Sequence, residues 1–455
     1  MQFIGRQIGF ERQAVGSGIR LVVVLLALAL PTNVVAQLPS TAEGANGVLR
    51  LPPPIAAPPR QPEELPPHGL SLADVEQMAL DNNPTLTAVR ARIAAARGSQ
   101  VQAGLCPNPV VGYMADEMGD DGTAGMQGGF IGQRFITGGK LRLDRAMAAR
   151  DVQEMQSVRT SQEFRVLSDV RLRFYDALVA QRKVELTGKL LSISQNFTDL
   201  SQQLLDARQI SQNDLLLVEI ETEESQIVAE NALNEQKEAW RRLTAFIGVA
   251  SLKPLPLTGE LAADLPVYDW EQSYSGILGN SPELAAASAR VERARLAIQR
   301  ARRENIPNID LMVSVQHMNQ DGDNIAGVQA GIPIPVLNRN QGNIMKTDAE
   351  LVAATHDVRR IELDLRDRLA IAFRRYANAK HQVDRYTEKI LPRAHRSLDV
   401  VTRGYAGGQV DFLTLLTSQR TYIRANLSYL ASLAELRQAA TVIQGQLLTD
   451  SLKTD

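Results

Sequence analysis

The apolar residues of the last hundred positions follow a heptad pattern. They return at alternating steps of four and three, with Arg, Lys, Asp and Glu between them. This spacing is typical of a coiled-coil seam and predicts a helix that needs helical partners along most of its length. An uninterrupted helix from Asn343 to Arg403 would span about 90 Å, more than a compact domain holds. The seam consists of Leu365, Leu369, Ala372, Tyr376, Ala379, Val383, Tyr386 and Ile390.

A second pattern, at the start of the predicted helices, occurs twice in the chain. Ser71 and Asp74 have the spacing of a helix N-cap with a carboxylate three residues later. About 198 residues further on, Asp269 and Gln272 take the corresponding positions. The pairs Pro84/Pro282, Leu86/Leu284, Ala91-Arg92/Ala289-Arg290 and Ala96-Arg97/Ala294-Arg295 follow without a gap. Such an ordered set predicts an internal duplication.

Each half also contains two short segments in which apolar and polar residues alternate, as in half-buried strands. They are 109–116 and 126–135 in the first half, and 310–317 and 327–334 in the second. Each has about the length that crosses a bilayer when tilted. Four strands cannot close a barrel, and an open sheet edge in lipid is prohibitive. We therefore expect other copies of the chain to complete the sheet.

The rest of each half is predicted to be a helical hairpin. Turn-forming residues at 138–140 and 338–342 lead into the long helices. The chain is expected to reverse near 209–214 and near 404–411. The segment 250–267 contains three prolines and is interpreted as the linker between the halves.

The first 68 residues are predicted to lie outside the folded repeats. Arginines followed by the apolar run 21–30, with small residues before Gln37, predict a secretory signal peptide. The stretch that follows is rich in proline, which fixes φ and lacks an N–H donor, so it cannot form a helix or the interior of a sheet. It is interpreted as a tether. The predicted organisation is a signal peptide (1–36), a tether (37–68), a first repeat (69–249), a linker (250–267), a second repeat (268–449) and a tail (450–455).

Composition excludes several classes of protein. The chain of 455 residues has a net charge of −2, without the basic excess that binding to nucleic acid favours. The single cysteine, Cys106, excludes an intramolecular disulfide and is expected to be a small buried residue. The five histidines lack metal-ligand spacing, so no metal site or cofactor is expected. No phosphate loop, His-Glu-x-x-His motif or nucleophile elbow is present, so no enzyme and no catalytic residue is predicted.

Six short motifs follow one another at fixed spacing across the two halves. They are Asn82-Asn83-Pro84-Thr85-Leu86, Pro107-Asn108-Pro109, Gly138-Gly139-Lys140, Asn280-Ser281-Pro282-Glu283-Leu284, Pro335-Val336-Leu337-Asn338-Arg339 and Gln409-Val410-Asp411-Phe412-Leu413. In this order they resemble the outer-membrane efflux protein family, the TolC-like channels, over about 69–446. The early Pro-Asn-Pro and the gapless amino-terminal helix are most similar to the heavy-metal and cation efflux branch, although the lipid-attachment cysteine of some of its members is absent.

The resemblance implies a mainly α fold with a small β part. Long coiled-coil hairpins of a homotrimer would form a periplasmic barrel. Four strands per chain would contribute to one twelve-stranded transmembrane β-barrel in outer-membrane lipid. It also implies a passive exit duct of a tripartite efflux pump for metal ions or small toxic compounds. The partners would be a periplasmic adaptor (membrane fusion) protein and an inner-membrane pump of the resistance-nodulation-division type. The alternatives are a type I secretion duct for protein export and a soluble periplasmic coiled-coil adaptor.

The second reversal holds the candidate gate. From the residues alone, Asp411 fits the first turn of a helix, where a carboxylate interacts with the helix dipole. The resemblance places it at the periplasmic mouth, where threefold symmetry would make a cation-binding ring of carboxylates. Asp214 is expected to cap a helix at the first tip or to contact the gate. Tyr405 and Arg403 are candidates to lock neighbouring helices or to pack on the surface. The remaining candidates are Thr414, where a second acidic ring is not expected, and Gly404, Gly407 and Gly408, which permit the reversal.

Overall fold

The computed structural model describes residues 69–119, 122, 124–407 and 409–453. The predicted signal peptide and tether, Gly408 and the last two residues of the tail lie outside the described residues. The described residues belong to one compact unit. Among the helices described, none combines the length and apolarity needed to cross a membrane.

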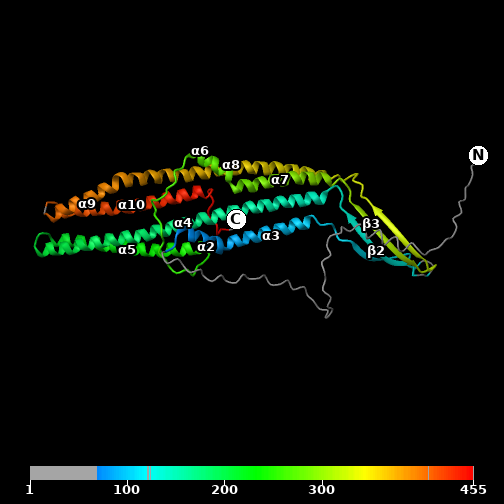
Figure 1. Ribbon diagram of the computed structural model, residues 1–455, viewed down its shortest axis with the longest axis horizontal. Helices are drawn as coiled ribbons and strands as arrows, with labels where there is room; N and C mark the ends of the chain where they lie inside the picture. The colour runs from blue at the N-terminus through cyan, green and yellow to red at the C-terminus, as the bar shows by residue number, and fades with distance from the viewer. Residues whose placement is uncertain (1–68, 120–121, 123, 408, 454–455) are drawn as a thin grey trace, which may run out of the picture. The chain divides into compact units, whose positions relative to one another are not determined.

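The fold is mainly helical with one small sheet, and the same order of elements occurs twice (Figure 1). This confirms the predicted fold class, whereas the exact domain bounds stay a prediction. The first half contains α2 (Leu72–Asn82), α3 (Pro84–Ala103), β1 (Val110–Asp116), β2 (Met126–Phe135), α4 (Lys140–Asp206) and α5 (Gln212–Ile247). The second contains α6 (Trp270–Asn280), α7 (Pro282–Arg303), β3 (Ile309–Met318), β4 (Asn324–Gly331), α8 (Gln341–Arg385), the π-helical turn η2 (Tyr386–Ile390), α9 (Leu391–Ala406) and α10 (Phe412–Gln444).

The duplicated Asn-Pro and Ser-Pro steps explain why each half begins with two helices instead of one. The Asn83 side chain accepts a hydrogen bond from the Thr85 N–H at 3.0 Å, and Pro84 is the first residue of α3. Ser281 caps α7 by accepting a hydrogen bond from the Leu284 N–H, and Pro282 follows it as the first residue of the helix. Proline suits a first helical position because its missing N–H would have no helical partner there. It also disfavours helical backbone in the residue before it.

The four strands form one antiparallel sheet in the order β1-β2-β3-β4, which leaves β1 and β4 as its edges. β2 and β3 join the two halves from Met126 opposite Met318 to Phe135 opposite Ile309. Three strands lie where the alternation predicted them. β4 ends at Gly331, three residues before the predicted end, because Pro333 and Pro335 cannot donate hydrogen bonds to a strand ladder.

The long helices next to the sheet form a layer in the same order. α3 packs on α4, α4 on α7, and α7 on α8. The hydrophobic core lies where this layer meets α2, α5, α6, α10 and the segment 250–267. Leu70 forms an isolated parallel bridge with Leu257, which is buried. Six positions of the predicted seam are buried, namely Leu365, Leu369, Ala372, Tyr376, Ala379 and Val383.

The last two seam positions are not buried within one chain. Tyr386 is only half-buried and Ile390 is exposed. The helix forms a π turn here, in which the Leu391 N–H bonds to the Tyr386 carbonyl. Pro392 follows and has no N–H for a carbonyl one turn earlier. The extra residue in the turn shifts the heptad register, so the seam leaves the buried face.

The expectation for Cys106 was also wrong, because its side chain is exposed. It lies between α3 and β1, next to Leu105, which is 52% exposed.

Candidate functional site

The first hairpin reverses between α4 and α5 through a closed capping box. Ser211 donates from its Oγ to Asp214 Oδ2 at 2.8 Å, and its backbone N–H donates to the same oxygen at 3.0 Å. The Asp214 N–H in turn donates to Ser211 Oγ at 3.2 Å. Two backbone donors at the helix start are therefore satisfied reciprocally. Asp214 thus makes the hydrogen bonds that its predicted capping role requires. Its contact with the gate stays a prediction.

At the second hairpin the helix start is capped by a single side-chain hydrogen bond. Asp411 precedes α10, and its Oδ1 accepts the Thr414 N–H at 3.1 Å. Hydrogen bonds from Thr414, first the side chain and then the backbone, hold the pKa of the exposed Asp411 carboxyl below its usual value. Asp411 is therefore a charged carboxylate at neutral pH, at the end of the hairpin. Thr414 acts as the partner of the cap.

The glycines at this tip differ in what they do. A Cβ on Gly404 would lie 2.7 Å from Val410 Cγ2, so the close return of the chain favours glycine there. Gly407 has φ −89°, which any residue can adopt. Gly408 lies outside the described residues.

Of the two predicted locking residues, only Tyr405 contacts the other hairpin. It is 8% exposed. Burial raises the pKa of its hydroxyl, the Ser201 hydroxyl of α4 lowers that pKa by hydrogen bonding, and the charge of Asp214 raises it. Arg403 instead donates to Asp399 of its own helix at 2.7 Å, and both side chains are exposed. Tyr405 is therefore a neutral, buried contact between the tips, and Arg403 is a surface residue.

Further contacts between the hairpins lie behind the tips, and sequence reasoning missed them. Arg420 of α10 donates from Nε to Glu221 Oε2 of α5 at 2.7 Å. The Glu221 side chain is only 9% exposed. Gln419 donates to Ser194 Oγ of α4 at 2.9 Å. One signal could have found the ion pair, because Glu221 follows Leu215 and Val218 on the buried face of α5, where a carboxylate needs a partner.

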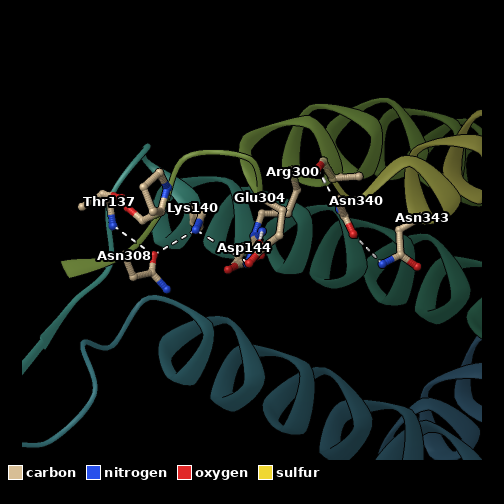
Figure 2. A network of polar contacts seen from close by, with 10 residues as sticks. Thr137, Lys140, Asp144, Arg300, Glu304, Asn308, Asn340 and Asn343 are labelled. Atoms are coloured by element: carbon tan, nitrogen blue, oxygen red, sulfur yellow. Dashed lines mark hydrogen bonds and ion pairs between the residues drawn. The ribbon is translucent and has the colours of Figure 1, made fainter. Parts of the chain in front are cut away.

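The opposite end of the helices, where strands become helices, is held by a polar network (Figure 2). Lys140 is the first residue of α4 and is 2% exposed. Its Nζ lies 2.9 Å from Asn308 Oδ1 and 3.7 Å from Glu304 Oε1. Gly138 and Gly139 before it have φ +68° and +69°, which favours glycine at both positions. A buried lysine is thus paired across the two halves.

The same network continues along the helices (Figure 2). Arg300 of α7 donates to Asp144 of α4 at 2.8 Å and also bonds to Glu304. The hydrogen bond from Arg300 is the main reason that the pKa of Glu304 is lowered. Asn340 donates to the Ala301 carbonyl at 2.8 Å, which fastens the start of α8 to α7. These groups bond to one another, so the network fixes the joint between sheet and helices.

Within the described part of the chain, no three His, Cys, Asp or Glu side chains gather as metal ligands would. What the structure brings together at the tips is an exposed carboxylate, a buried tyrosine and two hairpin ends in contact. The exposed carboxylate can attract cations, and the contacts between the two hairpin ends hold them together in this structure.

Comparison with known proteins identifies the class. A family model described as outer membrane efflux protein matches residues 75–249 and 273–445. The chain therefore belongs to this family, which consists of efflux channels and not of enzymes. It is an outer-membrane protein, and its helical part lies in the periplasm.

Several individual proteins of known name are similar to this chain. The cobalt-zinc-cadmium resistance protein CzcC of Cupriavidus metallidurans is 25% identical over 381 residues, which cover 82% of this chain and 89% of that protein. The crystal structure of CusC matches with a TM-score of 0.70 at 15% identity, over 83% of this chain and 92% of CusC. The open state of the MtrE outer membrane channel of Neisseria gonorrhoeae matches with a TM-score of 0.68 at 17% identity. This match covers 82% of this chain and 88% of the MtrE chain. At these identities the structural matches show a shared fold.

Proposed function

We propose that this protein is the passive exit duct of a tripartite efflux pump. Three copies would form a channel from the periplasm to the exterior, gated at the periplasmic tips of the hairpins. A periplasmic adaptor protein would connect it to an inner-membrane pump of the resistance-nodulation-division type. The substrates would be metal ions or other small toxic compounds.

The arrangement of free edges supports assembly from several copies. Sheet and helical layer share one order, so β1 and α3 lie on one side and β4 and α8 on the other. An unpaired strand edge exposes backbone donors and acceptors that invite another strand. Such head-to-tail contacts form a closed ring when the rotation between copies closes.

The likeness to CzcC supports metal ions as substrates. It extends over most of both chains. Asp411 adds a negative charge at the tip, and threefold symmetry would bring three such carboxylates near one axis. Carboxylate rings attract cations in channels.

The proposed gate is supported mainly by one observation. Tyr405 of the second tip is buried near Ser201 of the first hairpin. Contacts between the hairpins at this point have to break before the tips can separate. Asp214 and Arg403 would have secondary roles, as a cap and as a surface residue. Gly404 would allow the tight return of the moving tip.

Deletion of the gene tests the function. Growth should become sensitive to cobalt, zinc and cadmium salts, and a plasmid copy should restore it. Sensitivity confined to antibiotics and dyes would overturn the substrate class. In parallel, light scattering of the detergent-purified protein should give the mass of a trimer. Recovery as a water-soluble monomer would overturn the duct.

A further inference from the structure

The sheet carries its methionines on one face only. Successive side chains of a strand point to opposite faces, and the register of the ladders shows which positions of neighbouring strands share a face. One face, called here the thioether face, holds every methionine of the four strands, namely Met114, Met126, Met312 and Met318. Strands favour β-branched and aromatic residues, and methionine is not among them. The one-sided distribution therefore has a reason other than strand propensity.

The two faces of the sheet differ in polarity. The middle of the other face holds large exposed apolar side chains, namely Val111, Tyr113, Val315 and Val328. The middle of the thioether face instead includes Ser314 and Gln316, which are both buried. Strands in a membrane alternate apolar residues toward lipid with polar residues toward the water-filled interior. The thioether face is therefore the one that would line the proposed duct.

Three of the methionines lie together at the loop end of the sheet. Met126 of β2 is directly opposite Met318 of β3, and the Cβ atoms of such a pair are about 4.5–5.5 Å apart. Met114 of β1 is opposite Gly128, so it lies on the diagonal from Met126. All three methionines are half-buried. Their unbranched side chains have three rotatable bonds each, and Gly128 places no side chain between them. The three sulfur atoms can therefore converge above β2. Met114, Met126 and Met318 are called here the thioether patch.

The charges around the thioether patch favour a cation. Asp116 lies opposite Met126 on the same face, and its Oδ2 accepts a hydrogen bond from Gln316 Nε2 at 2.9 Å. Arg134 is the only arginine or lysine among the residues of β1 to β4. It lies at the other end of β2 and is paired with Asp310 at 2.7 Å. A carboxylate thus stands beside the three thioethers, and no lysine or arginine of the strands is paired with it.

The sulfur of methionine is a soft ligand. Soft thioethers select Cu(I), whereas carboxylates and water suit harder ions. Ag(I) shares the charge and the softness of Cu(I). We propose that the thioether patch binds soft monovalent cations, Cu(I) and Ag(I). Its place in the exit path rests on the proposed function, whereas the patch itself lies within one chain. In such a path, an ion has to bind well enough to enter and weakly enough to leave.

Titration with silver nitrate tests the thioether patch. The protein is the full chain in detergent, with Cys106→Ala because the exposed thiol would bind the same ions, in buffer without chloride. Calorimetry should show a saturable site. The variant M126L/M318L keeps the side-chain volume and removes two sulfur atoms. It should weaken silver binding by at least the roughly 10–100-fold that loss of an outer-shell partner costs a metal site.

A matched control separates the patch from methionine in general. The variant M147L/M155L replaces two methionines of α4 that are also half-buried, and it should bind silver as the parent chain does. Equal silver affinities of M126L/M318L and M147L/M155L would overturn the patch.

A second measurement identifies the ligands directly. X-ray absorption at the silver edge should show sulfur neighbours in the parent chain and in M147L/M155L, and should show fewer in M126L/M318L. An excess of zinc nitrate should not displace the silver, because zinc competes for carboxylates more than for thioethers. Silver with oxygen neighbours only, or displaced by zinc, would assign the binding to Asp116 and overturn the patch.

The outcomes also separate this inference from the proposed function. A trimer by light scattering whose silver affinity does not depend on Met126 and Met318 overturns the patch and leaves the duct intact. A water-soluble monomer overturns the duct. Silver binding that depends on these methionines would support the patch in either case, because the strand ladders that form it lie within one chain.

Discussion

The two hairpins follow one plan, but they differ in continuity. In the first, α4 runs for 67 residues without a break, and a closed capping box begins α5. In the second, a π turn and Pro392 interrupt the path between α8 and α9, and a single aspartate caps α10. Interruptions of this kind are where helices bend. We therefore expect the second hairpin to be the moving part of the proposed gate and the first to be its support.

The largest effect is expected from the contact between the two tips. Tyr405→Ala removes a buried ring, and loss of a fully buried aromatic side chain costs about 3–5 kcal/mol. Even about 1.4 kcal/mol of this, if lost from the closed state alone, changes the open-to-closed ratio tenfold. Conductance in planar bilayers should therefore rise at least tenfold. Tyr405→Phe keeps the ring and should change conductance much less. Equal conductance of the Tyr405→Ala and Tyr405→Phe channels would show that the ring does not hold the gate closed.

The ion pair behind the tips should have the next largest effect. Arg420→Ala leaves the Glu221 carboxylate nearly buried without its closest cation, which destabilises the closed contact. We expect conductance to rise several-fold. Arg403→Ala is the matched control, because its ion pair is exposed and lies within one helix. If both arginine variants behave alike, α5 and α10 do not hold the gate shut.

The two capping aspartates allow a direct comparison of the tips. Asp411→Ala should weaken block of the channel by multivalent cations a few-fold, because three charges leave the mouth together. Asp214→Ala should leave the block nearly unchanged, although either loss of a cap costs about 1 kcal/mol of helix stability. Titration of the block with cobalt(III) hexammine in bilayers measures both. If Asp214→Ala weakens the block more than Asp411→Ala does, the first hairpin and not the second lines the mouth of the channel.

The smallest effect concerns pH. The pKa of Asp411 is lowered in the folded chain, so its capping contribution is fully present above the usual aspartate pKa, about 3.9. That contribution is lost as pH falls through the lowered value. Cation block should therefore be constant from pH 7 to pH 5 and weaken only below about pH 4. Asp411→Asn should remove this pH dependence, and a pH dependence that persists in this variant would point to another group.

Local patterns in the sequence predicted much of this fold. The seam from Leu365 to Val383 and three of the four strands follow from periodicity, because burial of one face enforces it. The π turn was missed because a heptad count does not register a proline six residues after Tyr386. The end of β4 was missed for a related reason, since Ile332 and Ile334 continue the alternation while Pro333 and Pro335 cannot pair.

The candidate site was predicted only in part. Asp411 and Asp214 were found as caps because capping depends on residues three positions apart. The contact of Tyr405 with the first hairpin, and the pairing of Arg420 with Glu221, join segments about 200 residues apart in the chain. No local pattern encodes such a contact. The sequence therefore pointed to Arg403, which precedes the second tip, although its partner Asp399 lies on its own helix.

The central claim is that the channel opens when the second tip moves away from the first. It is tested by joining S201C and Y405C, in a chain with Cys106→Ala, through a short reducible cross-linker between the two thiols. Single-channel conductance should be low while the linker is intact and should rise when a reductant cleaves it. Each single-cysteine variant treated with the same reagent serves as control. Equal conductance of the linked and the cleaved trimer would contradict the account.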